Sequence, residues 1–279
     1  MPIGLRNAVF AEEKPAMLTP LQIGQFRAMG FLKLEGCLSS AEVEDLAAAH
    51  ERLITDAPAY DYFEDNLGLP SRGTLHQGRG PELDDEFAHF VEHERILEAQ
   101  RDIFGRPCLY HGGGEIWRNM SDTPWHSDVL GDPERDPDFY TIKVAFYLDE
   151  LDADSGSLNV IPGSHFPAYG QALLDECGYK EGGLRPRLHL QDPPGAVAVT
   201  TRPGDVVLFD TRIWHSAFAR PGGRRTAFIS YVPDPEDSPL RREQVRALIQ
   251  PFPYSEQLIE RAGPLRQAMI ARMRELDIA

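Results

Sequence analysis

The spacing of apolar residues along the chain is helical near both ends and strand-like in the middle. In the N-terminal part, Thr19 followed by Pro20 is typical of a helix N-cap and a first helical residue, and Gly30 is typical of a helix end. Apolar residues recur between them at roughly helical intervals. The pattern therefore predicts a helix that begins at Pro20 and ends before Gly30.

Further elements are expected before residue 108. The alternating run "FLKLEG" predicts a short strand, and Ser39 or Ser40 caps a predicted amphipathic helix over "AEVEDLAAAHERLI". Residues 56–84 lack apolar periodicity and contain many Gly, Pro and Asp residues, which predicts a long surface loop. Helical spacing returns over "DDEFAHFVEHERILEAQRDIFG", where we expect helical structure.

From Cys108 the pattern changes to short runs of β-branched and aromatic residues, which Gly, Pro and Asp turns separate. The runs are "LYHGGGEIWRN", "YTIKVAFYLDEL", "SLNVIPGSH", "GAVAVTTRPGDVVLFDT", "IWHSAFAR" and "TAFISYVP". This spacing is typical of an antiparallel sandwich or barrel, and helical spacing returns near the C-terminus. We therefore predict one α+β domain over 1–279, with a helical part at 19–105, a β core at 108–232 and C-terminal helices at 238–277.

Composition excludes several classes of function. The 279 residues are 42% hydrophobic, enough for a large core, and a net charge of −16 disfavours binding to nucleic acid or to anionic membranes. The chain has no run of 18 apolar residues that would span a membrane and no apolar segment typical of a signal peptide. Three scattered cysteines do not suggest a disulfide framework, so we expect a reducing, cytoplasmic setting.

The stretch "TPWHSDVLGDP" places His126 and Asp128 two positions apart in a segment too rich in Gly and Pro for a helix. In an extended strand the two side chains leave on the same face, where they can bind one metal ion together with a ligand from another strand. His215 in "FDTRIWHSA" is the candidate third ligand. Two imidazoles and one carboxylate form the facial triad of non-haem Fe(II) oxygenases, although the same spacing also describes cupin-like isomerases and zinc hydrolases.

Four motifs, "TPWHSD", "DADSGSLNVIPGSH", "RPGDVVLFDTRIWH" and "GGRRTAFISYVP", stand in the order and at the spacing of the phytanoyl-CoA dioxygenase (PhyH) family. The resemblance covers roughly residues 108–232, with weaker similarity nearer the N-terminus. It implies a double-stranded β-helix, or jelly roll, framed by helices, and a reaction that uses Fe(II), 2-oxoglutarate and O2. His126, Asp128 and His215 would be the iron ligands. Asp128 favours hydroxylation over halogenation, because related halogenases have glycine or alanine at that position.

The resemblance also implies an anchor for 2-oxoglutarate. The distal carboxylate of 2-oxoglutarate needs a cation, and arginine offers a bidentate fork. Aligning "GRRTAFISYV" with the end of the family pattern places Arg224 at the anchoring position, on the same face as Thr226 and Phe228. Arg225 would lie on the opposite face, and it is the alternative if the register differs by one residue.

The substrate is expected to be a small organic molecule. Trp117, Tyr140 and Arg212 lie near the metal motifs in sequence and are candidates for substrate contacts, with Arg212 as the candidate for binding an acidic group. The predicted loop at 56–84 and an insertion at 168–195 are candidate lids that would exclude water. The PhyH family acts on fatty acyl-CoA, ectoine-like amino acids, terpenoids and phosphonates, and the sequence does not choose among them.

The sequence thus predicts an oxidoreductase, a 2-oxoglutarate-dependent dioxygenase that hydroxylates an unactivated C–H bond. Desaturation, ring closure and epimerisation begin with the same hydrogen abstraction and stay open as outcomes. The alternative is a non-redox cupin-type isomerase or hydrolase that uses Zn or Mn, and it would not need an anchor at Arg224. His165 in "PGSH" is interpreted as a structural residue. We expect no nucleic-acid or membrane partner, while monomer and homodimer both stay open.

Overall fold

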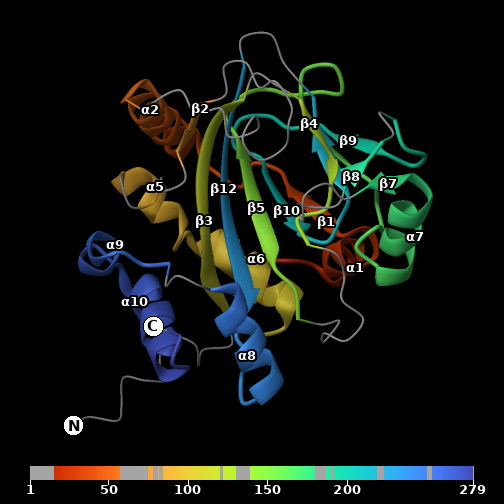
Figure 1. Ribbon diagram of the computed structural model, residues 1–279. Coiled ribbons are helices and arrows are strands. Elements are labelled where there is room, and N and C mark those ends of the chain that lie inside the picture. The colour runs from red at the N-terminus through yellow and green to blue at the C-terminus, as the bar shows by residue number, and fades with distance from the viewer. Residues whose placement is uncertain are drawn as a thin grey trace.

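The computed structural model describes residues 16–56, 75–77, 81, 84–119, 122–129, 139–179, 187–189, 192–218, 223–249 and 253–278. In these residues the chain forms two antiparallel β-sheets with helices around them, as Figure 1 shows. The prediction of a mixed α+β protein is therefore confirmed.

Each sheet contains six strands within the described ranges. The sheet whose strands contain more residues is called the larger sheet, and the other the smaller sheet. The larger sheet has the order β1-β10-β5-β12-β3-β2, with bounds Phe31–Leu34, Val206–Asp210, Ile142–Tyr147, Arg224–Pro233, Cys108–Asn119 and Leu75–Gln77. The smaller sheet has the order β7-β8-β4-β11-β6-β9, with bounds Gly178–Tyr179, Arg187–Leu188, Thr123–His126, His215–Ala217, Leu158–Val160 and Val197–Val199. The larger sheet thus takes two strands from the N-terminal part of the chain, including the predicted strand "FLKL".

Two of the N-terminal helices begin where the sequence supplies capping side chains. The Thr19 side chain accepts a hydrogen bond from the backbone of Gln22 and caps α1 (Pro20–Met29), as predicted. Ser39 and Glu42 form the same reciprocal arrangement at the start of α2. The other helices described are α2 (Ser40–Asp56), α5 (Asp85–Phe90), α6 (Glu94–Phe104), α7 (Pro167–Cys177), α8 (Pro239–Leu248), α9 (Glu256–Glu260) and α10 (Pro264–Glu275).

The segment 84–105 is helical, as predicted, but in two helices, α5 and α6, with a break at 91–93 that the pattern did not indicate. The carboxylate of Glu92, in the break, accepts hydrogen bonds from the backbone amides of Gly263 and Arg266 at the start of α10. These contacts come from residues more than 170 positions away. A tertiary interaction, which local periodicity does not report, therefore accompanies the break.

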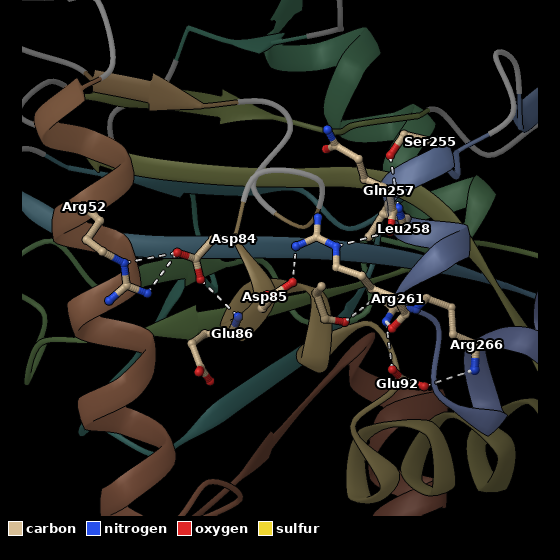
Figure 2. A network of polar contacts seen from close by, with 11 residues as sticks. Arg52, Asp84, Asp85, Glu86, Glu92, Ser255, Gln257, Leu258, Arg261 and Arg266 are labelled. Carbon is tan, nitrogen blue, oxygen red and sulfur yellow. Dashed lines mark hydrogen bonds and ion pairs between the residues drawn. The ribbon is translucent and has the colours of Figure 1, made fainter.

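The C-terminal helices are tied to the N-terminal ones by a network of charged residues (Figure 2). Asp84 caps α5 through the backbone amide of Glu86, and it also accepts a hydrogen bond from Arg52 of α2 at 2.9 Å. Arg261, after α9, pairs with Asp85, and Arg266 of α10 lies 3.0 Å from Glu92. The network joins helices that are far apart in sequence, on the side of the larger sheet away from the smaller one.

Alternation along the strands gives the larger sheet two buried faces. On β10, Val207 and Phe209 belong to an apolar cluster that also includes Leu158 and Val160 of β6, so this face packs against the smaller sheet. Val206 and Leu208 belong instead to the large cluster that the helices form with the opposite face. A side chain on the larger sheet therefore points either between the two sheets or toward the helices.

The segments predicted as lids are described only in part. Most of the loop at 56–84 lies outside the described residues, as does 180–186 within the insertion at 168–195. The described part of the insertion contains α7, which contacts β7 and β8 at the edge of the smaller sheet (Figure 1). Among the described residues, no helix combines the length and the apolarity required to cross a membrane.

Candidate metal centre

Three predicted ligand residues come together on the smaller sheet. His126 is the last residue of β4 and His215 is the first residue of β11, and the two are direct partners across these strands. Asp128 follows two residues after His126, and its Oδ1 lies 3.7 Å from His126 Nε2. One ligand atom from each of the three residues lies within 4.8 Å of the other two. Side chains separated by up to 89 positions thus converge on one point.

Backbone carbonyls determine which nitrogen of each histidine faces this point. His126 Nδ1 lies 2.8 Å from the carbonyl oxygen of Pro124, and His215 Nδ1 lies 2.9 Å from that of Ile213. A carbonyl only accepts, so each Nδ1 carries the proton and donates it. The lone pair of each neutral ring then lies on Nε2, the usual arrangement for a metal-binding histidine.

The two tryptophans that precede the histidines in sequence hold both strands in place. Trp125 and Trp214 belong to one buried apolar cluster with Ile161 and Leu188. Because side chains alternate along a strand, burying a tryptophan on one side turns the next residue, a histidine, to the other. The same local rule therefore orients both imidazoles.

Hydrogen bonds to neighbouring turns fix the rest of the site. The Ser164 hydroxyl, from the "PGSH" motif, accepts a hydrogen bond from the backbone amide of Trp214 at 2.8 Å. The backbone amide of Asp128 donates to the carbonyl of Thr211 at 3.0 Å. His165 does not join the three ligands, since its Nε2 lies 3.1 Å from the carbonyl oxygen of Arg27.

Lys143 is a site residue that the sequence analysis missed. Its ammonium lies 2.6 Å from Asp128 Oδ2 and within 6 Å of the ring centroids of Phe209 and Phe228. It shares the inward face of β5 with Ala145 and Tyr147, which pack between the sheets. A charged residue at an inward position of an otherwise apolar strand was the signal available in "IKVAFY".

His111 on β3 is a second missed residue. Burial and, to a lesser extent, the positive charge of Lys143 lower the pKa of His111 to about 4, against the opposing effect of the Asp128 charge. The imidazole of His111 is therefore neutral at pH 7. Its place in the glycine-rich stretch "LYHGGG" offered no sequence signal that separated it from an ordinary strand residue.

The two candidate anchors have different surroundings. The Arg224 side chain is buried, with the residue 3% exposed, and donates a hydrogen bond to the carbonyl of Phe218 at 2.5 Å. Burial lowers the pKa of Arg224, and the nearby Tyr147 and Asp122 oppose that shift. Arg225 points away from this interior and binds Asp149 at 2.9 Å.

The candidate substrate residues lie in two different places. Trp117 pairs with Thr226 in the β3–β12 register, which puts it on the face that carries Phe228, between the two sheets. Arg212 binds Asp210 at 2.6 Å and stacks on Tyr140, with 4.7 Å from the guanidinium carbon to the ring centroid. Strand alternation puts Asp210 on the helix side of the larger sheet, since Phe209 faces the smaller sheet.

The donor set suits a divalent transition metal. Two neutral imidazoles and one carboxylate are the ligands of the 2-His-1-carboxylate centre, which prefers Fe(II) and leaves coordination positions open. Two basic residues of the larger sheet also point between the sheets, Lys143 beside Asp128 and the buried Arg224. The fold and this centre therefore define the class as a metal-dependent enzyme with a site between two antiparallel sheets.

The chain belongs to the phytanoyl-CoA dioxygenase (PhyH) family, whose model matches residues 26–227. The predicted class, an oxidoreductase that uses iron and 2-oxoglutarate, is thereby confirmed. The ectoine dioxygenase of Streptomyces coelicolor is 24% identical over 263 residues, which cover 81% of this chain and 84% of that protein.

Two solved structures have a similar fold. The epimerase SnoN, in complex with Fe3+, alpha ketoglutarate and nogalamycin RO, has a TM-score of 0.60 at 19% identity, covering 77% of this chain and 83% of its own. HygX from Streptomyces hygroscopicus, with nickel, 2-oxoglutarate and hygromycin B bound, has a TM-score of 0.57 at 23% identity, covering 77% of this chain and 88% of its own.

Proposed function

We propose that the protein is an Fe(II)- and 2-oxoglutarate-dependent dioxygenase that oxidises an unactivated C–H bond of a small organic molecule, with His126, Asp128 and His215 as the iron ligands. The observation that carries the proposal is the convergence of three ligand atoms within 4.8 Å, with each histidine Nδ1 held by a backbone carbonyl. A histidine cluster that served only packing would not need both tautomers set in this way.

We further propose that the two sheets are the halves of a jelly roll and that the whole chain forms one domain. Support comes from the antiparallel order of the strands, from the apolar cluster that both sheets share, and from the likeness to SnoN and HygX. The helices that cover the outer face of the larger sheet then form a further layer of the same domain, because they share one apolar core with that sheet.

Arg224 is the proposed anchor for the distal carboxylate of 2-oxoglutarate. The β5–β12 register pairs Thr226 with Tyr147 and Ser230 with Lys143, so Arg224 and the metal centre lie toward opposite ends of the same two strands. A 2-oxo acid would lie between them. Burial keeps water from competing for the guanidinium, and its planar fork fits a carboxylate.

Lys143 is proposed to hold the Asp128 carboxylate and to offset negative charge at the centre. Its ammonium lies beside Oδ2, whereas Oδ1 faces His126 Nε2. The dianionic co-substrate would enter a site that already contains one carboxylate. A fixed positive charge beside that carboxylate lowers the electrostatic cost of bringing both anions together.

Bound Fe(II) would supply the redox chemistry, using O2 and the 2-oxo acid to cleave the substrate C–H bond. The residues of this chain would position the reactants and exclude water. Asp128 keeps a carboxylate where halogenases have none, which favours hydroxylation. Trp117, on the face between the sheets, is the candidate to contact the substrate.

Anaerobic titration of the metal-depleted protein with Fe(II), followed by 2-oxoglutarate, tests this function. We expect a weak visible charge-transfer band when the 2-oxo acid chelates iron, and no band with His126→Ala. Substrate-dependent formation of succinate should follow on admission of O2. Absence of the band, together with a reaction that Zn alone supports, would show that the protein is a non-redox metal enzyme instead.

A further inference from the structure

A cavity of about 650 Å³ lies on the helix side of the larger sheet. The strand β10 contributes Asp210 to its wall. Phe209, the residue before Asp210, faces the smaller sheet, so Asp210 faces the other way. The cavity therefore lies on the face opposite to the metal centre. Phe26 of α1 and Ile103 of α6 complete the wall, and both belong to the apolar cluster between the helices and the sheet. None of the three candidate metal ligands lines it.

Positive charge predominates around this cavity although the chain as a whole carries a net charge of −16. Among the described residues that line it, the charged ones are four arginines and two acids: Arg27, Arg106, Arg212, Arg241, Asp210 and Glu236. A local excess of arginine attracts anions even in a protein that is acidic as a whole. The cavity is large enough for a medium-sized organic molecule.

Two of these charges form a closed pair. Arg212 binds both oxygens of Asp210, at 2.9 Å to Oδ1 through Nε and at 2.6 Å to Oδ2 through Nη2, and Asp210 is 1% exposed. The guanidinium also stacks on Tyr140. This pair therefore builds the wall and leaves the recognition of a ligand to the remaining arginines.

Glu236 shows where an anion would bind. Its carboxylate oxygen Oε2 lies 3.2 Å from Arg106 Nη1 and 3.5 Å from Arg241 Nη1, so one carboxylate stands between two guanidiniums. Both distances exceed the roughly 2.7–2.9 Å of strong charge-assisted bonds. The Glu236 side chain is 60% exposed, so a ligand can displace it toward solvent.

Aromatic side chains cover the rest of the cavity. Phe104 and Tyr140 lie with their ring centroids 5.4 Å apart, and Phe166 is 50% exposed beside them. We propose that this cavity is a second binding site, for an organic anion with an apolar or aromatic body. Its carboxylate or phosphate group takes the position of Glu236 between Arg106 and Arg241.

Isothermal titration calorimetry of the full chain with benzoate and with phenyl phosphate tests the site. We expect saturable binding of at least one probe, weakened by about tenfold or more in Arg241→Gln, which removes one charge-assisted contact. Glu236→Gln should bind the same probe several-fold more tightly, because it removes the competing carboxylate. The tighter probe identifies the anionic group as carboxylate or phosphate ester.

Matched controls separate this site from general charge effects and from the metal centre. Arg202 and Glu150 form an exposed ion pair. Arg202→Gln removes one positive charge, as Arg241→Gln does, and Glu150→Gln removes one negative charge, as Glu236→Gln does. Both control variants should leave probe binding unchanged. Arg224→Gln should also leave it unchanged, whereas loss of binding in that variant would place the probe between the sheets and overturn the proposal. No binding of either probe, or equal binding by wild type and Arg241→Gln, would overturn it as well.

Discussion

At the scale of single residues, a backbone group contacts each candidate metal ligand, and the Asp128 carboxylate also pairs with Lys143. Pro124 and Ile213 offer carbonyls to the two histidines, and Thr211 holds the backbone of Asp128. Truncating a histidine removes its bond to the carbonyl, but the pairing of β4 with β11 and the cluster around Trp125 and Trp214 stay in place. The fold of such a variant should therefore persist while the metal site loses one donor.

We expect His126→Ala, Asp128→Ala and His215→Ala each to abolish 2-oxoglutarate-dependent formation of succinate. Each variant keeps only two of three ligands, too few to define the coordination sphere. Equilibrium dialysis with Mn(II) should show weakened metal binding in the same variants. His189→Ala, at an exposed histidine, is the control. Full turnover in any one ligand variant would remove that residue from the centre.

Arg224→Ala should raise the dissociation constant of 2-oxoglutarate by roughly two orders of magnitude or more, since two charge-assisted bonds of about 1.5–3 kcal/mol each are lost. Arg224→Lys should recover part of the affinity, because an ammonium cannot reproduce the planar fork. Arg225→Ala should change the affinity little, as Arg225 binds Asp149. Anaerobic titration of the three variants gives the comparison, and a large effect at Arg225 alone would reverse the assignment.

Lys143→Met should affect two ligands in opposite directions. Removing the ammonium beside Asp128 removes repulsion of a divalent cation, so Mn(II) should bind more tightly, and 2-oxoglutarate should then bind the loaded protein more weakly. We expect changes on the order of tenfold each. Lys33→Met on β1, which breaks an ion pair with Glu35, should change neither affinity. A variant that merely disturbed the fold would weaken both.

At this scale, what could be predicted from the sequence depends on how far apart two residues lie along the chain. His126 and Asp128 are two residues apart, so strand alternation alone predicts their common face. Lys143 meets Asp128 only through the pairing of β5 within the larger sheet and the packing of that sheet on the smaller one. No periodicity in either segment encodes that meeting, although an inward lysine in an apolar strand was visible.

At the scale of elements, the end of α1 depends on one glycine. Gly30 has φ of 83° and its amide bonds the carbonyl of Phe26. A Cβ at this position would lie 2.6 Å from His165 Nδ1. The close approach brings α1 against the turn that contains the "PGSH" motif, which in turn holds the strand of His215.

Gly30→Ala should therefore lower the free energy of unfolding by about 1–3 kcal/mol, from positive φ and the clash with His165. Gly24→Ala in the same helix should raise it by about 0.5–1 kcal/mol, because no atom lies within 4 Å of the added Cβ and alanine favours the helix. Urea unfolding of both variants measures the difference. If alanine raised the free energy of unfolding equally at both positions, neither the positive φ of Gly30 nor its contact with His165 would cost stability.

Capping signals allowed α1 and α2 to be predicted from sequence, because the capping side chains lie within three residues of the backbone they satisfy. The break between α5 and α6 was missed, because Glu92 binds residues of α10. Capping residues close in sequence thus predicted where α1 and α2 begin. The break between α5 and α6 could not be predicted in this way, because its contacts come from near the C-terminal end of the chain.

At the scale of the whole molecule, the candidate centre divides its parts between the two sheets. His126 and His215 belong to the smaller sheet, whereas Lys143 and Arg224 belong to the larger one. A metal ion alone would connect His126 and His215 of the smaller sheet with Asp128, which lies in the segment after β4. A 2-oxo acid that binds both the metal and Arg224 would connect the two sheets.

Thermal unfolding should report this division. Mn(II) with 2-oxoglutarate, each at about 100 times its dissociation constant, should add about 2.7 kcal/mol of stability per ligand. At roughly 2–4 °C per kcal/mol, the Tm should rise by about 5–10 °C for each ligand in turn. Arg224→Ala should keep the increase from Mn(II) and lose most of the increase from 2-oxoglutarate at the same concentrations, since the metal ligands are intact. His126→Ala should lose both, because the 2-oxo acid needs the metal at one end. If 2-oxoglutarate raised the Tm equally in Arg224→Ala, the acid would not be anchored in the larger sheet.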